Sequence, residues 1–337
     1  MAISGAASYI PTTEDFLGHW ELVNAALPAG QPLLVSGEAL KRTSAIAVAE
    51  LEGFYTALLA KHAEVQSAIN AADIRHAEVA TLKGALLAII NLFNPAVRGL
   101  MGSSAYAQTL ADVPSSSSGQ GDFTKPMDDT EDLWERINTA PPPNFAAPLT
   151  LTDGTTVFTL ADFTTTLGLL KQRYRTAAKA DSLVDLRRAE RNALQDSIYP
   201  VLKFYRMTVP VRLGPTAPLT LTLPRLTPEP GSTPEPAVVS GSYDVPQNRA
   251  VVSAQVPVQA DLQRIKLLYS PGLEWHGDDT SVVESRSAAG LDLSQPVVFE
   301  TTYALGTPGS TALFRVEVEN DTDNTAQSNT LIIERPA

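Results

Sequence analysis

The chain has 337 residues, a net charge of −12, 25 prolines and no cysteine. This length predicts two or three domains, with enough residues to bury a sizeable apolar core. The acidic balance argues against a protein whose main ligand is the phosphate backbone of nucleic acid. Without cysteine, the chain has no disulfide bond, thiolate metal site or cysteine nucleophile.

The N-terminal residues include no basic residue ahead of an apolar segment. We therefore expect no typical signal peptide, and by default a cytoplasmic location. The most apolar stretch, residues 82–93, contains Lys83 and Asn91 and is shorter than the roughly 18 residues that a membrane span needs. We expect a soluble chain without a membrane span.

Two windows with few prolines carry the apolar periodicity of helices. Proline is absent from residues 33–94, and from residues 149–209 except for Pro200. Since proline interrupts helices, we expect the helices in these windows. In each window, apolar residues recur at steps of three and four on both sides of a polar break, at 70–73 and at 181–182. Each window therefore predicts two antiparallel helices, an αα-hairpin, with a kink or break at Pro200.

Short motifs recur in the same order in both windows. The sequence WELVN begins at Trp20, and WERIN begins at Trp134, 114 residues later. A Pro-Leu segment follows each tryptophan, and a Val-Arg pair ends each unit, again 114 residues apart. The pattern predicts an internal duplication of one module: a short helix, an extended segment and a helical hairpin. We interpret both tryptophans as anchors of the core.

Two helical hairpins packed together bury the apolar stripes that one hairpin leaves exposed. The predicted fold class is therefore multidomain α plus β, with duplicated αα-hairpin modules in a pseudo-twofold four-helix bundle, followed by a β-sandwich. The expected boundaries are 1–112 for the first helical repeat, 113–126 for a Ser/Gly-rich loop, 127–212 for the second repeat, 213–236 for a Pro-rich linker and 237–337 for the sandwich.

From about residue 237 the periodicity changes from helical to alternating. Phe314, Val316 and Val318 alternate with Arg315 and Glu317, which is typical of a strand with one buried face. Seven short segments of this kind are separated by Gly, Pro, Asn and Asp, which predicts a seven-stranded sandwich. The predicted strands lie at 238–239, 251–256, 262–269, 280–284, 297–301, 313–318 and 330–333.

Residues 314–320 (FRVEVEN) and 328–333 (SNTLII) resemble the last two strands of fibronectin type III domains. The resemblance covers about residues 230–337. The chain departs from the family in lacking the early-strand tryptophan and in having Phe314 where the family has tyrosine. The resemblance implies a sandwich used for adhesion, spacing or partner contact rather than for catalysis.

The sequence contains no phosphate-binding loop, complete dinucleotide-binding glycine motif or nucleophile elbow. His62 and His76 flank the expected turn of the first hairpin, but the second repeat has no histidine to complete a symmetric metal site. We interpret both histidines as exposed polar residues. We expect no catalytic residue, no cofactor and no metal.

Two loops of the expected sandwich can be interpreted either as plain turns or as binding sites. Trp275 and His276 precede Gly-Asp-Asp and are candidate contacts for a carbohydrate or protein ligand. Asp321 and Asp323 lie in a run of oxygen-bearing side chains that calcium accepts as ligands, although the run lacks the glycine and glutamate of an EF-hand. Turn chemistry is sufficient to explain both loops.

Charge is unevenly distributed along the helical part. Residues 111–162 carry a net charge of −7 and residues 163–212 carry +6. The basic segment is compatible with a nucleic-acid patch, a solvated helix face, or a head-to-tail contact between subunits. The candidate interaction residues are Arg173, Arg175, Arg187, Arg188 and Arg191 on the basic side, and Asp128, Asp129, Glu131 and Asp132 on the acidic side.

These patterns favour a non-catalytic structural or interaction protein that self-associates through its charged helical surfaces and its sandwich. One alternative is an adhesin-like module that binds carbohydrate or protein through the loop of Trp275. A less favoured alternative is a metal-dependent enzyme in the helical bundle. Nucleic acid is not an expected partner.

Overall fold

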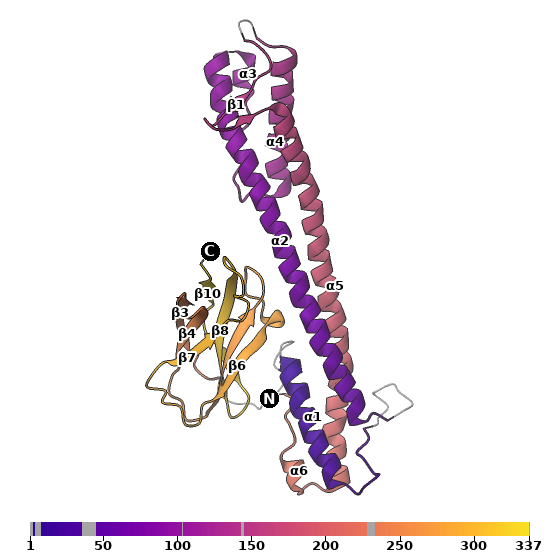
Figure 1. Cartoon of the computed structure of the whole chain (residues 1–337). Coiled ribbons are helices and arrows are strands. Elements are labelled where there is room, and N and C mark those ends of the chain that lie inside the picture. Colours follow the sequence, from indigo (N-terminus) through magenta and orange to yellow (C-terminus); the bar gives the residue numbers. More distant parts are fainter. Residues whose placement is uncertain are drawn as a thin grey trace. The chain divides into compact units, whose positions relative to one another are not determined.

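The computed structural model describes residues 3, 8–35, 45–102, 104–142, 145–227 and 233–336. The N-terminal part is helical and the C-terminal part consists of β-sheets, as the change of periodicity predicts (Figure 1). Part of the first Pro-Leu segment, at residues 36–37, and residues 228–232 of the Pro-rich linker lie outside the described residues.

The chain divides into two compact units. Unit 1 consists of Met1–Asn70 and Asp185–Ala337, and unit 2 consists of Ala71–Val184. Unit 1 contains one helical core and the core of the sandwich, and unit 2 contains the other helical core.

Each proline-poor window forms one continuous helix, so the predicted αα-hairpins are wrong. Helix α2 spans Val48–Met101 and helix α5 spans Leu160–Leu213, with 54 residues each. The polar break at 70–73 contains neither proline nor glycine, and Ala72 within it is buried, so the core-facing stripe continues through it. Three main helices, rather than a four-helix bundle of two hairpins, surround the core of each unit.

The second predicted break is also helical. The hydroxyl of Ser182 donates to the carbonyl of Ala178 at 3.0 Å, a bond within the helix rather than a cap on a new one. Helix α5 also continues through Pro200. Both long helices end at glycines in the left-handed conformation, Gly102 (φ 52°) and Gly214 (φ 95°), which glycine adopts without strain.

The core of unit 2 lies among α2, α4 (Gln120–Thr139) and α5. Trp134 is fully buried, and its ring centroid lies 5.1 Å from that of Phe93 and 5.9 Å from that of Phe163. Trp134 therefore holds the three helices together. Smaller elements pack around this core: α3 (Ala105–Gln108), β1 (Leu151–Thr152) and β2 (Val157–Phe158).

The helical core of unit 1 lies among α1 (Tyr9–Ala26), the start of α2 and the end of α5. Trp20 is fully buried, and its ring centroid lies 4.6 Å from that of Tyr205. The interpretation of both tryptophans as core anchors is confirmed.

Equivalent residues make the same contacts in the two units. The indole N–H of Trp20 donates to the Leu33 carbonyl at 3.3 Å, and that of Trp134 donates to the Leu149 carbonyl at 3.1 Å. The asparagine four residues after each tryptophan accepts the N–H of the same leucine, at 2.8 Å in both units. The repeated motif thus builds the same clamp twice.

Helix α5 begins and ends 112 residues after α2. At this offset the ion pairs between the two helices also correspond. In unit 1, Lys61 of α2 lies 2.9 Å from Glu190 of α5. In unit 2, Arg173 of α5 lies 3.4 Å from Glu78 of α2. Lys61 corresponds to Arg173 and Glu78 corresponds to Glu190, so the basic residue lies on α2 in unit 1 and on α5 in unit 2.

The sandwich has eight strands in two sheets within the described residues. One sheet has the order β3-β4-β7, and the other has the order β10-β8-β5-β6, with β9 paired to β8. All of these pairings are antiparallel. The strands are β3 (Val238–Asp244), β4 (Arg249–Gln255), β5 (Leu262–Ser270), β6 (Ser281–Ser287), β7 (Val297–Thr301), β8 (Thr311–Asn320), β9 (Thr325–Gln327) and β10 (Leu331–Glu334).

The core of the sandwich comes from both sheets. Phe299 of β7 and Phe314 and Val316 of β8 are fully buried in it, which confirms the predicted alternation of β8. Each of the seven predicted segments overlaps a strand. The sequence pattern misses β9, because its three residues are all half-buried and show no alternation.

The described part of the Pro-rich linker is not a free spacer. It contains α6 (Pro218–Leu221), and Leu226 is buried against the helical core. Arg225 donates to the Asp321 carbonyl at 2.8 Å and lies 3.5 Å from the Asp323 carboxylate. The linker therefore contacts both the helical core and the sandwich of unit 1.

Candidate functional site

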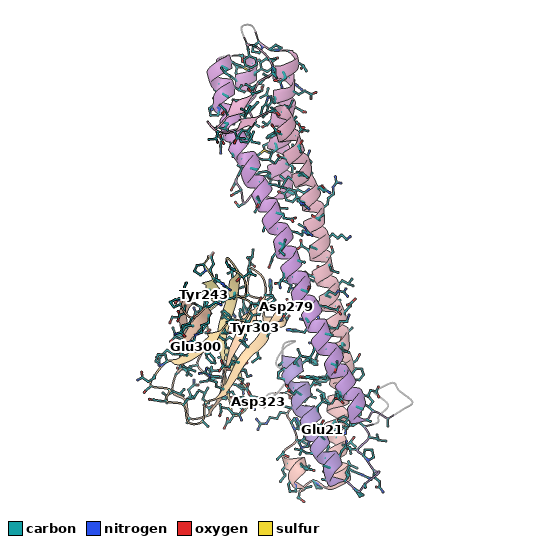
Figure 2. The ribbon with its side chains drawn as sticks, in the orientation of Figure 1. Glu21, Tyr243, Asp279, Glu300, Tyr303 and Asp323 are labelled. Atoms are coloured by element: carbon teal, nitrogen blue, oxygen red, sulfur yellow. The ribbon has the colours of Figure 1, made fainter. Side chains whose placement is uncertain are left out.

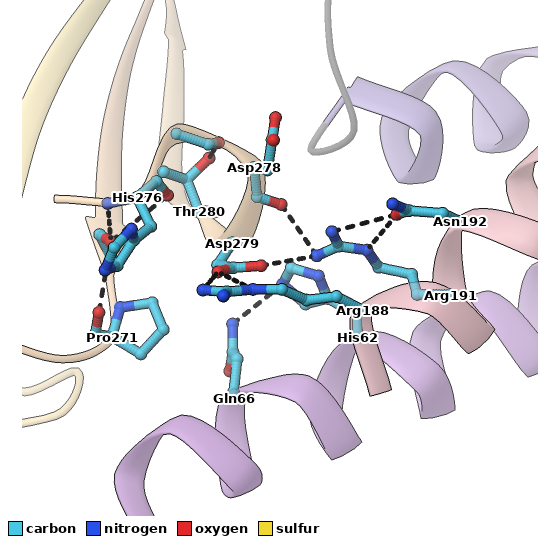
Figure 3. A network of polar contacts seen from close by, with 12 residues as sticks. His62, Gln66, Arg188, Arg191, Asn192, Pro271, His276, Asp278, Asp279 and Thr280 are labelled. Atoms are coloured by element: carbon cyan, nitrogen blue, oxygen red, sulfur yellow. Dashed lines mark hydrogen bonds and ion pairs between the residues drawn. The ribbon is translucent and has the colours of Figure 1, made fainter. Parts of the chain in front are cut away.

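The loop between β5 and β6 is shaped by its own hydrogen bonds. The Ser270 hydroxyl accepts the N–H of His276 at 3.0 Å, and the Asp279 N–H donates to the His276 carbonyl at 3.1 Å. A short 3-10 turn, Gly277–Asp279, follows. These bonds direct the Asp279 side chain toward the helices of unit 1, as Figures 2 and 3 show.

Two arginines of α5 form ion pairs with the Asp279 carboxylate. Arg188 Nη2 lies 2.5 Å from one carboxylate oxygen of Asp279, and Arg191 Nη1 lies 2.8 Å from the other (Figure 3). Arg191 also donates to the Asp278 carbonyl at 2.9 Å. Arg191 is 2% exposed and Asp279 is 1% exposed, so this pair is shielded from water. A buried charge keeps its ionised form only where a partner compensates it, and each of the two supplies that partner.

Helix α2 contributes a neutral histidine beside this pair. The Gln66 amide donates to His62 Nε2 at 2.9 Å and also donates to the Ser281 hydroxyl. Because an amide N–H only donates, His62 Nε2 accepts and carries no proton. Burial lowers the pKa of His62, the charge of Arg191 lowers it further, and Asp279 opposes part of this shift. His62 is buried, so its interpretation as an exposed polar residue is wrong.

A depression of about 350 Å³ opens beside these residues. Three of its charged groups, Arg188, Arg191 and Asp279, are already paired with one another, because both oxygens of Asp279 accept from arginine. These pairs form a polar joint between the sandwich and the helices. The residues that line the depression are Arg188, Arg191, Asn192, Trp275, His276, Gly277, Asp278 and Asp279.

The structure brings Trp275 and His276 into this joint, although the two side chains differ in exposure. Trp275 is half-buried, and the Arg315 guanidinium lies 4.4 Å from its ring centroid. Burial lowers the pKa of Arg315. His276 is exposed. A stacked arginine covers part of the surface that a ligand of Trp275 would need.

Most of the candidate charged residues pair within the chain. Lys171 lies 2.6 Å from Asp128, which joins the acidic and basic segments inside unit 2. Asp129 pairs with Lys125 at 3.1 Å. The remaining candidates include Arg187, which pairs with Glu64 and Glu190 at 3.1 and 2.8 Å, and Arg173, which pairs with Glu78. Arg175 and Asp132 are exposed and Glu131 is half-exposed, and no ion pair of these three is seen in the part of the chain that the structure describes.

The Asp-rich turn between β8 and β9 uses its oxygens internally. Asn320 Oδ1 accepts the N–H groups of Thr322 and Asn324 at 3.3 and 2.9 Å, and the carboxylate of Asp323 faces Arg225. Over the described ranges, no group of three or more His, Asp or Glu side chains is arranged to hold a metal ion. Turn chemistry accounts for the run.

The two histidines considered as a metal pair do not approach each other. His62 and His76 lie 14 residues apart on one continuous helix, about 21 Å along its axis. His76 instead lies 2.9 Å from Asp181 in unit 2. The predicted proximity failed because it depended on a hairpin turn near residue 70.

Sequence reasoning missed the central residues of the joint. It treated Asp279 as part of a loop tip, and it did not consider Gln66 or Ser281. The usable signal was Arg188 and Arg191, three residues apart and so on one helix face. No pattern in the sequence indicates that a loop about 90 residues later supplies their partner.

Helix α2 contains a window of 18 residues that is apolar enough to cross a membrane by length and composition, and 39% of that window is buried inside the structure. The same helix supplies Leu86, Ile90 and Phe93 to the core of unit 2. Core helices pass such a test as well as membrane spans do.

Comparison of the chain with protein-family models, with curated proteins and with solved structures gives no significant match, so its function is argued from its own residues.

Proposed function

We propose that this is a non-catalytic structural or interaction protein, in which a helical support carries a fibronectin type III-like sandwich and copies of the chain self-associate. The observation that carries the proposal is the buried pair of Arg191 and Asp279. It joins two parts that have separate apolar cores, so its main effect is to orient one on the other. Orienting a binding domain on a support is what a scaffold requires.

We infer further that the helical part arose by internal duplication and has pseudo-twofold symmetry. The twin tryptophan clamps and the exchanged ion pairs support this inference. The left-handed glycines that end α2 and α5, Gly102 and Gly214, are also 112 residues apart. Each module would supply its short helix to one unit and a long helix that begins in that unit and ends in the other.

The strand order supports the fibronectin type III-like assignment of the sandwich. Strand β4 pairs with β7, and β5 pairs with β8, so the chain passes between the two sheets before pairing. These are the Greek-key connections of immunoglobulin-type sandwiches, an architecture that fibronectin type III domains share. Such a domain supports a role in spacing or partner contact.

Sedimentation of the full chain over a range of protein concentrations tests the self-association. We expect a sedimentation coefficient that rises with concentration and falls with added salt, because exposed charges are screened. A coefficient that stays that of a monomer at every concentration and salt level would contradict the proposal. Added DNA duplex should leave the coefficient unchanged.

A further inference from the structure

We propose that the joint between the sandwich and α5 is exchangeable: Asp279 of one chain also enters the site of Arg188 and Arg191 on a second copy. This inference rests on the proposed self-association and names the surface that performs it. The partner is a second copy of this chain, and the contact in trans is the one seen within the chain.

The first argument is that each of the two parts has an apolar core of its own. The sandwich core is closed between its own two sheets, and the helical core of unit 1 is closed among α1, α2 and α5. Polar contacts join the two parts: Arg188 and Arg191 with Asp279, and Gln66 with Ser281. When such a contact opens, its charges regain water, so opening is far less unfavourable than exposing an apolar face.

The second argument is the reach of the connection. Helix α6 and the buried Leu226 hold the first part of the linker on the helical core of unit 1, so residues 227–236 remain to connect it to the sandwich. Ten residues span at most about 35 Å when extended. This length suffices for a sandwich to reach either its own helices or those of a neighbouring copy. Exchange through a linker requires no new interface, as in domain swapping.

The third argument is specificity. The residues 112 positions before Arg188 and Arg191 are His76 and Val79, at the equivalent place on α2 in unit 2. Val79 is buried in the core of unit 2 and has no charge to offer a carboxylate. Within the residues that the structure describes, each chain therefore has one sandwich and one receiving site. When two copies each dock their sandwich on the helices of the other, both receiving sites are occupied and the assembly is a closed dimer.

Competition between the two arrangements sets the concentration dependence. A covalent tether of this length holds the sandwich at an effective concentration of the order of millimolar. The contact within the chain therefore dominates in dilute solution, and the contact between chains gains at high local concentration. A change that weakens the contact within the chain but not the contact between chains should make the contact between chains detectable at micromolar concentration.

Two charge reversals achieve this separation. Asp279→Arg places a cation against Arg188 and Arg191, and Arg191→Asp places an anion against Asp279 and leaves only Arg188 to attract it, so each variant weakens docking within its own chain. In an equimolar mixture, Arg191 of the first variant meets Asp279 of the second, and the two reversed residues also meet as an opposite pair. We expect the mixture to form a heterodimer at least about tenfold more tightly than either variant self-associates, because like charges oppose every other pairing.

Sedimentation velocity and small-angle scattering of the full-length chains measure these outcomes. Scattering of each single variant should show a larger radius of gyration than wild type, and circular dichroism should show unchanged helix and strand content. Asp278→Arg is the matched control for Asp279→Arg, because it is adjacent and exposed and only its carbonyl takes part. Arg175→Asp is the control for Arg191→Asp. Mixing the two controls should give no association beyond that of wild type at the same concentration.

A mixture that stays monomeric while both variants are folded and expanded would overturn the exchange. If wild type still self-associates in that case, the proposed function stands and uses another surface. If the mixture dimerises but wild type is monomeric at every concentration, the exchangeable joint is supported and the proposed self-association fails.

Discussion

The helical cores of units 1 and 2 have the same plan but differ in polarity. Both are built around a tryptophan clamp, and the aromatic ring that packs on the tryptophan is Tyr205 in unit 1 and Phe93 in unit 2. Next to it, unit 1 buries His19 where unit 2 buries Leu133, 114 residues later. The comparison teaches that the clamp defines the fold of a unit, whereas neighbouring positions are free to take other chemistry.

The polar pair of unit 1 is fully satisfied. The hydroxyl of Tyr205 lies 2.7 Å from His19 Nδ1, and His19 Nε2 lies 2.8 Å from the carbonyl of Leu219 in α6. A carbonyl only accepts, so His19 Nε2 carries the proton and Nδ1 accepts from the tyrosine. Burial lowers the pKa of His19, with the bond to Leu219 opposing part of the shift, and burial raises the pKa of Tyr205. Unit 1 has thereby gained a connection to α6.

The sandwich joint is the second difference. Unit 1 has the buried Arg191 at the place where unit 2 has the buried Val79. Arginine at a buried helix position requires a compensating anion, and the Asp279 carboxylate supplies it. The docking of the sandwich on unit 1 thus goes with two differences in the repeated helix face, Arg191 in place of Val79 and Arg188 in place of His76.

Loss of either tryptophan should be the largest effect. Trp20→Ala and Trp134→Ala each remove a fully buried side chain and its indole hydrogen bond, and each should lower the free energy of unfolding by about 3–5 kcal/mol. Denaturant titration followed by circular dichroism measures this. Trp275→Ala is the control, since Trp275 is only half-buried. A large loss at one tryptophan and none at the other would break the equivalence of the units.

Removal of the Asp279 carboxylate should separate the sandwich from its support. Breaking a buried ion pair by removing one partner costs about 3–5 kcal/mol while the other charge stays buried. Asp279→Ala should therefore release the sandwich so that Arg191 regains water, and proteolysis within residues 213–236 should accelerate. Asp181→Ala, at the exposed partner of His76 in unit 2, should leave the cleavage rate unchanged. Equal cleavage of Asp279→Ala and wild type would show that the pair does not hold the joint.

Acidification should destabilise unit 1 selectively. The pKa values of His19 and His62 are lowered in the folded chain, so below the usual histidine value of 6.5 the unfolded chain binds more protons than the folded one. Their neutral forms are fully compatible with folding above that pH, and stability is lost as the pH falls through 6.5 toward the folded values. Thermal unfolding of the full chain between pH 7 and about pH 5 measures the loss.

The double variant His19→Leu with Tyr205→Phe copies the apolar pair of unit 2 into unit 1. It should reduce the slope of stability against pH, and the remaining slope should come from His62. A slope identical to that of wild type would show that His19 is not a source of the pH dependence.

The smallest effects should come from the exchanged ion pairs. Glu190→Gln and Glu78→Gln each remove the acid of an exposed network, and exposed ion pairs contribute little to stability. The midpoint of thermal unfolding should fall slightly and by a similar amount in each variant. In high salt it should equal that of wild type. Hydrogen bonds from Lys61 and Arg187 lower the pKa of Glu190, so this contribution in unit 1 should also disappear at low pH as Glu190 is protonated. A large effect at only one of the two sites would contradict their equivalence.

The sequence predicted what depends on local pattern. Alternation located seven strand segments, and the WELVN and WERIN motifs identified Trp20 and Trp134 as anchors. It failed at residues 70–73 and 181–182, where polar residues suggested turns. Polar side chains interrupt an apolar stripe without ending a helix, since only the face toward the core needs to be apolar. A hairpin and a continuous helix therefore produce similar patterns at such a point.

The sequence by itself determined the order of helical and β-rich parts, the repeated clamp motif and the uneven charge, because each depends on residues near one another in the chain. Only the tertiary structure decided that α2 and α5 are unbroken and that His62 is buried. It also paired Arg188 and Arg191 with Asp279, about 90 residues later in the chain. Such a pairing is set by which surfaces meet once the cores have formed, and a charge in the sequence carries no record of its partner.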